Sequence, residues 1–380
     1  MLSPSPLLPP IPPERSAVIA QARRALLDHD SAASAAPMRI EPFITRSWQR
    51  CLSAGRQPRQ RIAFDAVSVA EAKRAALNSH DLVTAARPVL DRLARAIAAT
   101  RYFAILTDAR GVVVDVRGLP ANAERPAVDI ARIGVDLSER AVGTTAIGAA
   151  LAELQPVWLH RGEHFFDDTR HYSCAGAPLF GPDGRCVGML DLTGVNVVER
   201  PELKHLAALS VRSIENALVL QRPHALLVRL NWPGYGGSAE SEGLLGLDEE
   251  GHVTGSNAAA REMLQPALAG PATSARLHAS DLFALPWTML WDAARRGDGA
   301  VLEVPLWSGL RLQARPQMAR EGASDPETTA MRPPPRLRDV ETALIRKAVD
   351  EARGNVAEAA RVLGISRATV YRKLARGGRN

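Results

Sequence analysis

The sequence predicts an α+β protein of several domains that ends in an all-α helix-turn-helix. Three observations lead to this prediction. Apolar residues recur with helical period through the first hundred residues, strand-like runs separated by tight turns begin near residue 102, and helical period returns near residue 340. At 380 residues the chain is long enough for two or three domains.

Composition favours a cytoplasmic protein. The three cysteines are irregularly spaced, which argues against a disulfide framework and fits a reducing compartment. No run of eighteen apolar residues occurs, so we expect no membrane span. Residues 1–13 are rich in proline and lack the basic start and apolar core of a signal peptide, so we expect a disordered lead.

Residues 14–84 read as a mainly helical region. Helices are expected over 14–28, 40–54 and 65–78, and a fourth over 85–100 opens the next domain. In the second of these helices the apolar residues fall on one face, as in a helix packed on a core. They are Ile40, Phe43, Ile44, Trp48 and Leu52.

Residues 85–222 alternate strands with helices, as a small α+β domain does. A first hairpin turns at 108–111 and a second at Gly181-Pro182-Asp183-Gly184. We expect strands over 102–107, 112–116, 156–160, 172–180 and 185–192, and helices over 139–154 and 201–221.

Two runs in this region resemble the GAF sensor domain of acetoin-catabolism-type regulators. They are RSWQRC at 46–51 and GTTAIGAALAELQPVWLHRGEHFFDDTRHYSCAGAPLFGPDGRCVGMLDLTG at 143–194. GAF domains bury small ligands between a sheet and its covering loops, so the resemblance implies a small-molecule effector. We therefore expect a sensor domain over 85–222.

Histidines and a cysteine with the spacing H-x3-H-x6-H-x2-C mark the candidate ligand site. Imidazole and thiolate suit zinc or iron, but the spacing matches no common zinc pattern. The alternatives are a metal site, a polar lining for a small-molecule pocket, and ordinary loop and core side chains. We predict a ligand site and expect no metal or other cofactor. The predicted ligand-binding residues are His160, His164, Phe166, Tyr172, Cys174 and Asp191.

Residues 226–315 read as a second α+β segment. A strand-turn-strand is expected over 244–254, a helix over 257–264, and strands over 301–305 and 310–314. The segment resembles a PAS domain over short motifs, which implies a relay or dimerisation role. Residues 316–336 are rich in Pro, Ser, Thr and charge without period and are expected to form a flexible linker.

Residues 337–380 have the pattern of a helix-turn-helix. A helix over 340–353 ends at Gly354-Asn355, a second covers 356–363, and Ser366 caps a third after the Gly364-Ile365 turn. From residue 336 onward the sequence contains eleven basic residues and five acidic ones. The surplus of +6 equals the formal charge of the whole chain, so the basic excess lies at this end.

The run GNVAEAARVLGISRATVYRKL at 354–374 resembles the Fis-type DNA-binding domain of bacterial enhancer-binding proteins. The resemblance implies that the third helix faces DNA and that Asn355 touches a phosphate. Arginine in that helix has the donor geometry for a guanine edge, and lysine suits phosphate. The predicted DNA-binding residues are Asn355, Ser366, Arg367, Thr369, Tyr371, Arg372 and Lys373.

The chain departs from that family in one respect. It contains no G-x-x-x-x-G-K-[ST] sequence, and therefore no P-loop to hold nucleotide phosphates. Nor does it contain the G-A-F-T-G-A loop through which the family engages sigma-54. ATP-driven remodelling of sigma-54 polymerase is therefore not carried over, and no arrangement of residues supports catalysis.

We predict a cytoplasmic transcription regulator without enzyme activity, which binds double-stranded DNA as a homodimer and senses a small metabolite. One alternative is an accessory protein or antiactivator that competes or co-assembles with a full-length enhancer-binding protein, or that meets RNA polymerase. Another is a metal-dependent enzyme built on the histidine cluster.

Overall fold

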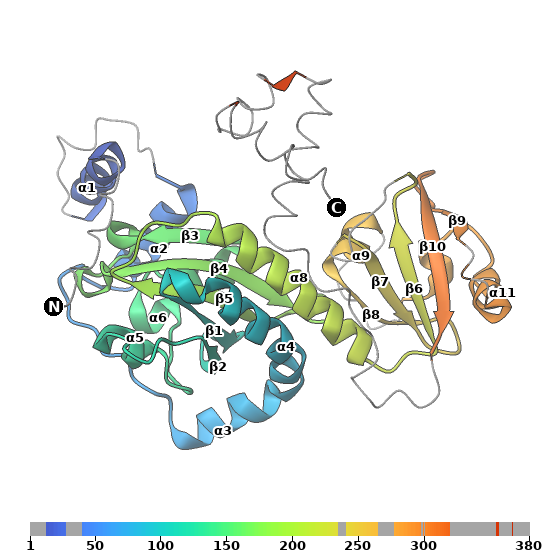
Figure 1. Ribbon diagram of the computed structural model, residues 1–380, viewed down its shortest axis with the longest axis horizontal. Helices are drawn as coiled ribbons and strands as arrows, with labels where there is room; N and C mark the ends of the chain where they lie inside the picture. The colour runs from blue at the N-terminus through green and yellow to red at the C-terminus, as the bar shows by residue number, and fades with distance from the viewer. Residues whose placement is uncertain are drawn as a thin grey trace. The chain divides into compact units, whose positions relative to one another are not determined.

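A computed structural model describes residues 13–27, 40–234, 241–264, 277–297, 299 and 301–319, together with Asn355, Val356 and Arg367 (Figure 1). The chain divides into two compact units, Met1–Ala319 and Arg320–Asn380. Residues 1–12 of the lead predicted over 1–13 lie outside the described residues, as do the linker from 320 onward and most of the helix-turn-helix, whereas Pro13 begins the first helix.

The four helices expected in the first hundred residues are all present. Ser68 starts the third later than predicted, because its hydroxyl accepts from the Glu71 amide while the Glu71 carboxylate accepts from the Ser68 amide. The fourth begins directly after Ser79, five residues before the predicted start. The helices are α1 (Pro13–Leu27), α2 (Pro42–Ser53), α3 (Val69–Asn78) and α4 (His80–Ile97).

The first sheet is antiparallel, with strand order β2-β1-β5-β4-β3. All five of its strands were expected, and β5 runs three residues further than predicted because it pairs with β1 on one side and β4 on the other. The strands are β1 (Tyr102–Asp108), β2 (Val113–Arg117), β3 (Val157–His160), β4 (Tyr172–Phe180) and β5 (Cys186–Val195).

Helices cover both faces of this sheet. On one face α4 packs beside the exit helix α8 (Leu203–Gln221), and Figure 1 shows the two side by side across the strands. On the other face lie α2 and three short helices, which enclose a second apolar core with Trp48 and Phe166 fully buried. The short helices are α5 (Arg125–Ile130), α6 (Glu139–Val142) and α7 (Ala146–Glu153).

The single helix expected over 139–154 is wrong, because it breaks at Gly143 into α6 and α7. Gly143 has φ 68° and ψ −156°, a conformation open almost only to glycine. Its missing side chain also leaves room for the Phe166 ring, and the Thr145 hydroxyl then caps α7 by accepting from the Gly148 amide. Helical propensity of the alanine-rich run gave no sign of this tertiary contact.

A second antiparallel sheet has the order β8-β7-β6-β10-β9, which differs from the order of the first. The strand β6 was not singled out from the sequence, and β10 runs to Met318, past the predicted domain end at 315, because it pairs with β6 along that length. The elements are β6 (Leu226–Asn231), β7 (Gly243–Leu247), β8 (Val253–Ser256), α9 (Ala258–Met263), α10 (Ala279–Leu282), α11 (Thr288–Arg296), β9 (Leu302–Pro305) and β10 (Arg311–Met318).

Replacing Gly143 by alanine should destabilise the protein by about 2 kcal/mol or more, since strain and a clash add. A methyl group there would lie 2.7 Å from a ring carbon of Phe166. Gly55→Ala is the matched control, because Gly55 also has positive φ but nothing lies within 4 Å of the added carbon. Chemical denaturation measures both. Equal losses in the two variants would contradict the packing argument.

Candidate functional site

A row of four polar side chains crosses the face of the first sheet that α2 and α7 cover. Cys174 on β4 stands opposite Thr193 on β5, and Asp191 follows two residues away on the same face. His164 approaches from the loop after β3, with its Nε2 atom 3.6 Å from the Cys174 sulfur. Each of the four side chains is almost wholly buried.

Asp191 is the member of this row with an unmet hydrogen-bonding need. The Thr193 hydroxyl donates to its Oδ2 atom, while its Oδ1 atom has no partner among the described residues. Burial raises the pKa of Asp191 to about 7, and the Thr193 hydrogen bond opposes that rise. The carboxyl group therefore gains or loses its proton near neutral pH.

His164 and Cys174 are both uncharged at neutral pH. Burial lowers the pKa of His164 to about 4, and its Nδ1 atom lies 3.0 Å from the Arg161 carbonyl oxygen, which can only accept. The ring proton therefore sits on Nδ1, and Nε2 accepts from the thiol. Burial raises the pKa of Cys174 well above its usual value, so the sulfur stays a thiol.

Two aromatic side chains of the predicted site belong to the apolar core on this side of the sheet. The Tyr172 hydroxyl donates to the Pro126 carbonyl of α5 at 2.9 Å, and its ring lies 6.4 Å from that of His164. Phe166 is fully buried and meets Phe165 edge to face. Five of the six predicted residues therefore lie on this side of the sheet, and His164, Tyr172 and Cys174 lie next to one another.

His160 is the exception, because its side chain lies on the opposite face of the sheet. It pairs with Ser173 in the β3–β4 register, one residue out of step with Cys174. Its ring stacks on Trp158 at 6.1 Å, and its Nδ1 atom lies 2.5 Å from the Ser173 hydroxyl. Burial lowers the pKa of His160 to about 3.

Thr193 is the residue of the row that the sequence prediction missed. Its signal was the alternation along β5, where Asp191 and Thr193 occupy one face and Leu190 and Leu192 the other. Two polar residues spaced by two in an otherwise apolar strand share a face.

The histidine and cysteine segment does not gather ligand atoms as a metal site would. Among the described residues, the one set of three such groups within 4.8 Å of one another is Asp248, Glu250 and His252 in the β7–β8 turn. That turn is partly exposed, and exposed acidic groups are common without an ion.

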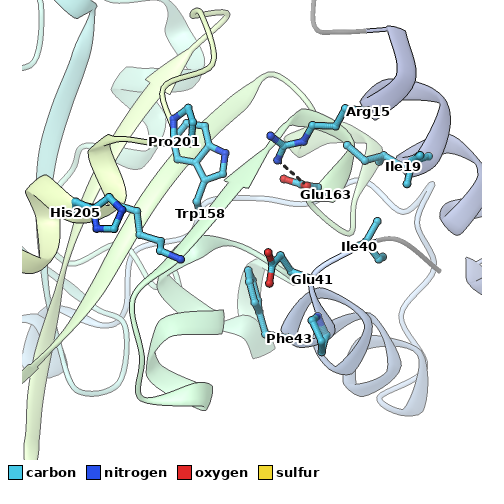
Figure 2. A pocket seen from close by; sticks show the side chains of 12 residues that line it. Arg15, Ile19, Ile40, Glu41, Phe43, Trp158, Glu163, Pro201 and His205 are labelled. Atoms are coloured by element: carbon cyan, nitrogen blue, oxygen red, sulfur yellow. Dashed lines mark hydrogen bonds and ion pairs between the residues drawn. The ribbon is translucent and has the colours of Figure 1, made fainter. Parts of the chain in front are cut away.

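A cavity of about 580 Å³ opens beside Trp158 at the edge strand β3, and residues of α1, α2 and the segment before α8 also line it (Figure 2). Figure 2 shows Glu163 paired to Arg15 on one side of the space and the Glu41 carboxylate directed into it. The Trp158 indole nitrogen has no hydrogen-bond partner within the described ranges. None of the residues of the polar row lines this cavity.

The structure describes three residues of the predicted DNA-binding segment. Asn355 is exposed, Val356 begins a helix where one was expected, and Arg367 is helical and exposed. The remaining predicted DNA contacts, Ser366, Thr369, Tyr371, Arg372 and Lys373, lie outside the described residues.

Two family models match the chain. The MimR N-terminal domain matches residues 18–216, which is more than half of the chain. The chain belongs to this family. The bacterial regulatory protein Fis family matches residues 336–377, over the predicted helix-turn-helix.

Similar proteins with curated names are regulators. The acetoin catabolism regulatory protein of Cupriavidus necator is 32% identical over 246 residues, which is 60% of this chain and 35% of that protein. The acetoin dehydrogenase operon transcriptional activator of Bacillus subtilis is 29% identical over 47% of this chain and 30% of that protein. The propane 2-monooxygenase operon transcriptional activator MimR of Mycolicibacterium goodii is 32% identical over 45% of this chain and 29% of that protein. The matches thus span about a third of each relative's length.

Among solved structures, the crystal structure of the E. coli DhaR(N)–DhaL complex matches with a TM-score of 0.45 and 15% identity. The match covers 73% of this chain and all of that one. Within the described residues no helix is both long and apolar enough to cross a membrane.

Replacing Asp191 by asparagine should stabilise the protein increasingly as pH rises from 4 to 7. The pKa of the carboxyl group is near its ordinary value of 3.8 in the unfolded chain and near 7 in the folded one, so wild-type stability falls across this window and is level above it. The difference between variant and wild type should grow by about 4 kcal/mol at most, and less if water reaches the site. Urea denaturation at each pH measures it. The two buried histidines titrate alike in both proteins, so a difference independent of pH would contradict the argument.

Proposed function

We propose that this protein is a transcription regulator that binds DNA through its C-terminal helix-turn-helix and senses a small molecule through its first α+β domain. The observation that carries the proposal is the presence of both family matches on one chain. The relatives that match the sensor region are named as regulators of operons, which supports the same reading. We further propose that it acts in the cytoplasm and without catalysing a reaction.

The DNA contacts are proposed for the third helix of the helix-turn-helix. Arg367 is exposed on a helix, as a base-contacting residue must be before it meets DNA. One such head buries little DNA surface, so we propose that two heads of a homodimer bind half-sites about one helical turn apart. The other proposed contacts are Asn355, Ser366, Thr369, Tyr371, Arg372 and Lys373.

The effector is proposed to bind against the covered face of the first sheet, beside Asp191, Cys174 and His164. The free Oδ1 atom of Asp191 supports this proposal, since a buried carboxyl oxygen without a partner is costly and a hydroxyl or amino group on a ligand would satisfy it. The row is packed, so the covering helices must part to admit a ligand. Such a change is the kind that could alter DNA affinity, because a ligand shifts only a state that it binds better.

The Arg367→Ala variant should lose about 1–3 kcal/mol of operator affinity and some sequence discrimination, if Arg367 contacts a base edge. The Lys373→Ala variant should weaken binding to all sequences alike and lower the salt dependence, since lysine suits phosphate. Fluorescence anisotropy with operator and scrambled duplexes at several salt concentrations measures both effects.

Removal of residues 337–380 tests whether the DNA-binding site lies in this segment. The shortened protein should keep its circular dichroism spectrum for the first unit and lose specific DNA binding. If it still distinguishes operator from scrambled DNA, the DNA-binding site lies elsewhere in the chain.

The Asp191→Asn and Tyr172→Phe variants should each raise about tenfold the effector concentration needed to change operator affinity, as expected for one lost hydrogen bond. Ligand-free operator affinity should change by less than about twofold. The effector would come from a thermal-shift screen of small metabolites, because a ligand stabilises the fold it binds. Trp158→Phe on the opposite face is the matched control. If only that variant loses the response, the effector binds in the cavity of Figure 2.

A further inference from the structure

A second and smaller cavity, of about 320 Å³, has four arginines among its eight lining residues. It lies between the last two turns of α1, the loop at Pro58 and Arg59, and the short 3-10 helix Asp167–Thr169. Its charged lining residues are Arg23, Arg24, Arg59, Arg170 and Asp167. Four guanidinium groups against one carboxylate give the lining a formal charge of +3.

Part of this charge is built into the fold. Arg23 is buried, donates to the carbonyl oxygens of Gly162, His164 and Phe165, and stacks on Trp48 at 5.5 Å. Arg23 also contacts Asp167 at 2.9 Å. Arg23 therefore holds α1 on the loop after β3 and has little capacity left for a ligand.

The one carboxylate of the cavity is already shared. Asp167 Oδ1 accepts from Arg23 and also from Arg170, whose Nη2 atom lies 2.6 Å away. Asp167 therefore cannot also neutralise Arg24 and Arg59. The nearby Asp168 does not line the cavity, and its carboxylate lies 3.4 Å from the Ile62 amide.

Arg24 and Arg59 have no ion-pair or hydrogen-bond partner among the residues that the structure describes, and both are exposed. The C-terminal end of α1 supplies roughly half a negative charge near Arg24, which offsets only part of the surplus. Two free guanidinium groups that share a concave surface with a third can each donate two parallel hydrogen bonds to a planar or tetrahedral oxyanion.

We propose that this cavity binds a small dianion, either a phosphorylated metabolite or a dicarboxylate, with Arg24, Arg59 and Arg170 as the donors. Its volume lies at the lower end of the range for small-molecule sites, which suits a compact anion. The bound anion joins α1 to the segment that continues from His164, so it would stiffen the cover of the polar row. The site is separate from the proposed effector site, because none of the residues of the polar row lines this cavity.

Isothermal titration of the full chain with pyrophosphate and with succinate, at constant ionic strength, tests the proposal. The Arg24→Gln/Arg59→Gln variant should bind the preferred anion at least tenfold more weakly than wild type. The matched control is Arg87→Gln/Arg95→Gln on α4, which removes the same charge from exposed residues that do not line the cavity, and it should bind within twofold of wild type. The pyrophosphate and succinate arms separate phosphoryl from carboxylate recognition. Thermal unfolding without ligand confirms that both variants fold.

Two results would overturn the proposal. Equal weakening in both double variants would mean that positive charge attracts anions without a specific site. No binding of either anion at millimolar concentration would mean that the cavity is not an anion site. Asp28 and Asp30 follow α1 in the sequence and are the chain's own candidate counter-ions. If the wild type fails to bind while Asp28→Asn/Asp30→Asn binds, the cavity serves an internal contact instead of a free ligand.

Discussion

The position of β5 is the constraint on which the first domain depends. This strand pairs with β1 on one side and β4 on the other, and helices cover both of its faces. From Gly188 to Val195 its residues are therefore buried, and any polar side chain there must find a partner within the protein. Asp191 and Thr193 meet that demand only in part, by bonding to each other and leaving one carboxylate oxygen free. A chain selected for stability alone would place apolar residues here, so the polar pair is a cost that a function would explain.

The loop after β3 covers the polar row. It places His164 over Cys174, and it is held in turn by the buried guanidinium of Arg23. An arginine that donates to three backbone carbonyl groups of a loop fixes the loop's backbone without needing any side chain from it. The position of the loop that covers the polar row therefore depends on the docking of α1, which lies about 140 residues earlier in the sequence.

Local sequence patterns identified most of the fold and only part of the site. Alternation and turn residues located all five strands of the first sheet, because both signals lie within each strand or directly beside it. The break at Gly143 and the separation of His160 from His164 could not be read in this way. The first depends on a phenylalanine that is 23 positions away in the sequence, and the second on a one-residue step in register. Arg23 was missed for the same reason, since its partners lie about 140 residues further along the chain.

The exit helix α8 gives the most direct physical route out of the first domain, because two adjacent residues on it bond in two directions. The buried Glu215 carboxylate accepts from the Phe180 amide at the end of β4, at 2.8 Å. The Asn216 side-chain oxygen accepts from Asn257, which caps α9 of the second sheet's domain, at 2.7 Å. Asn257 also accepts from Leu244 and Ala260 and donates to the Glu242 carbonyl, so all its hydrogen-bonding positions are used.

A saturated, buried amide has no alternative partner to move to, and a displacement of α8 must therefore carry β7 and α9 with it or break several hydrogen bonds at once. A displacement of the first sheet against α8 would therefore reach the second α+β domain through Asn216 and Asn257, which is the route that the proposed effector would use toward the proposed DNA-binding segment.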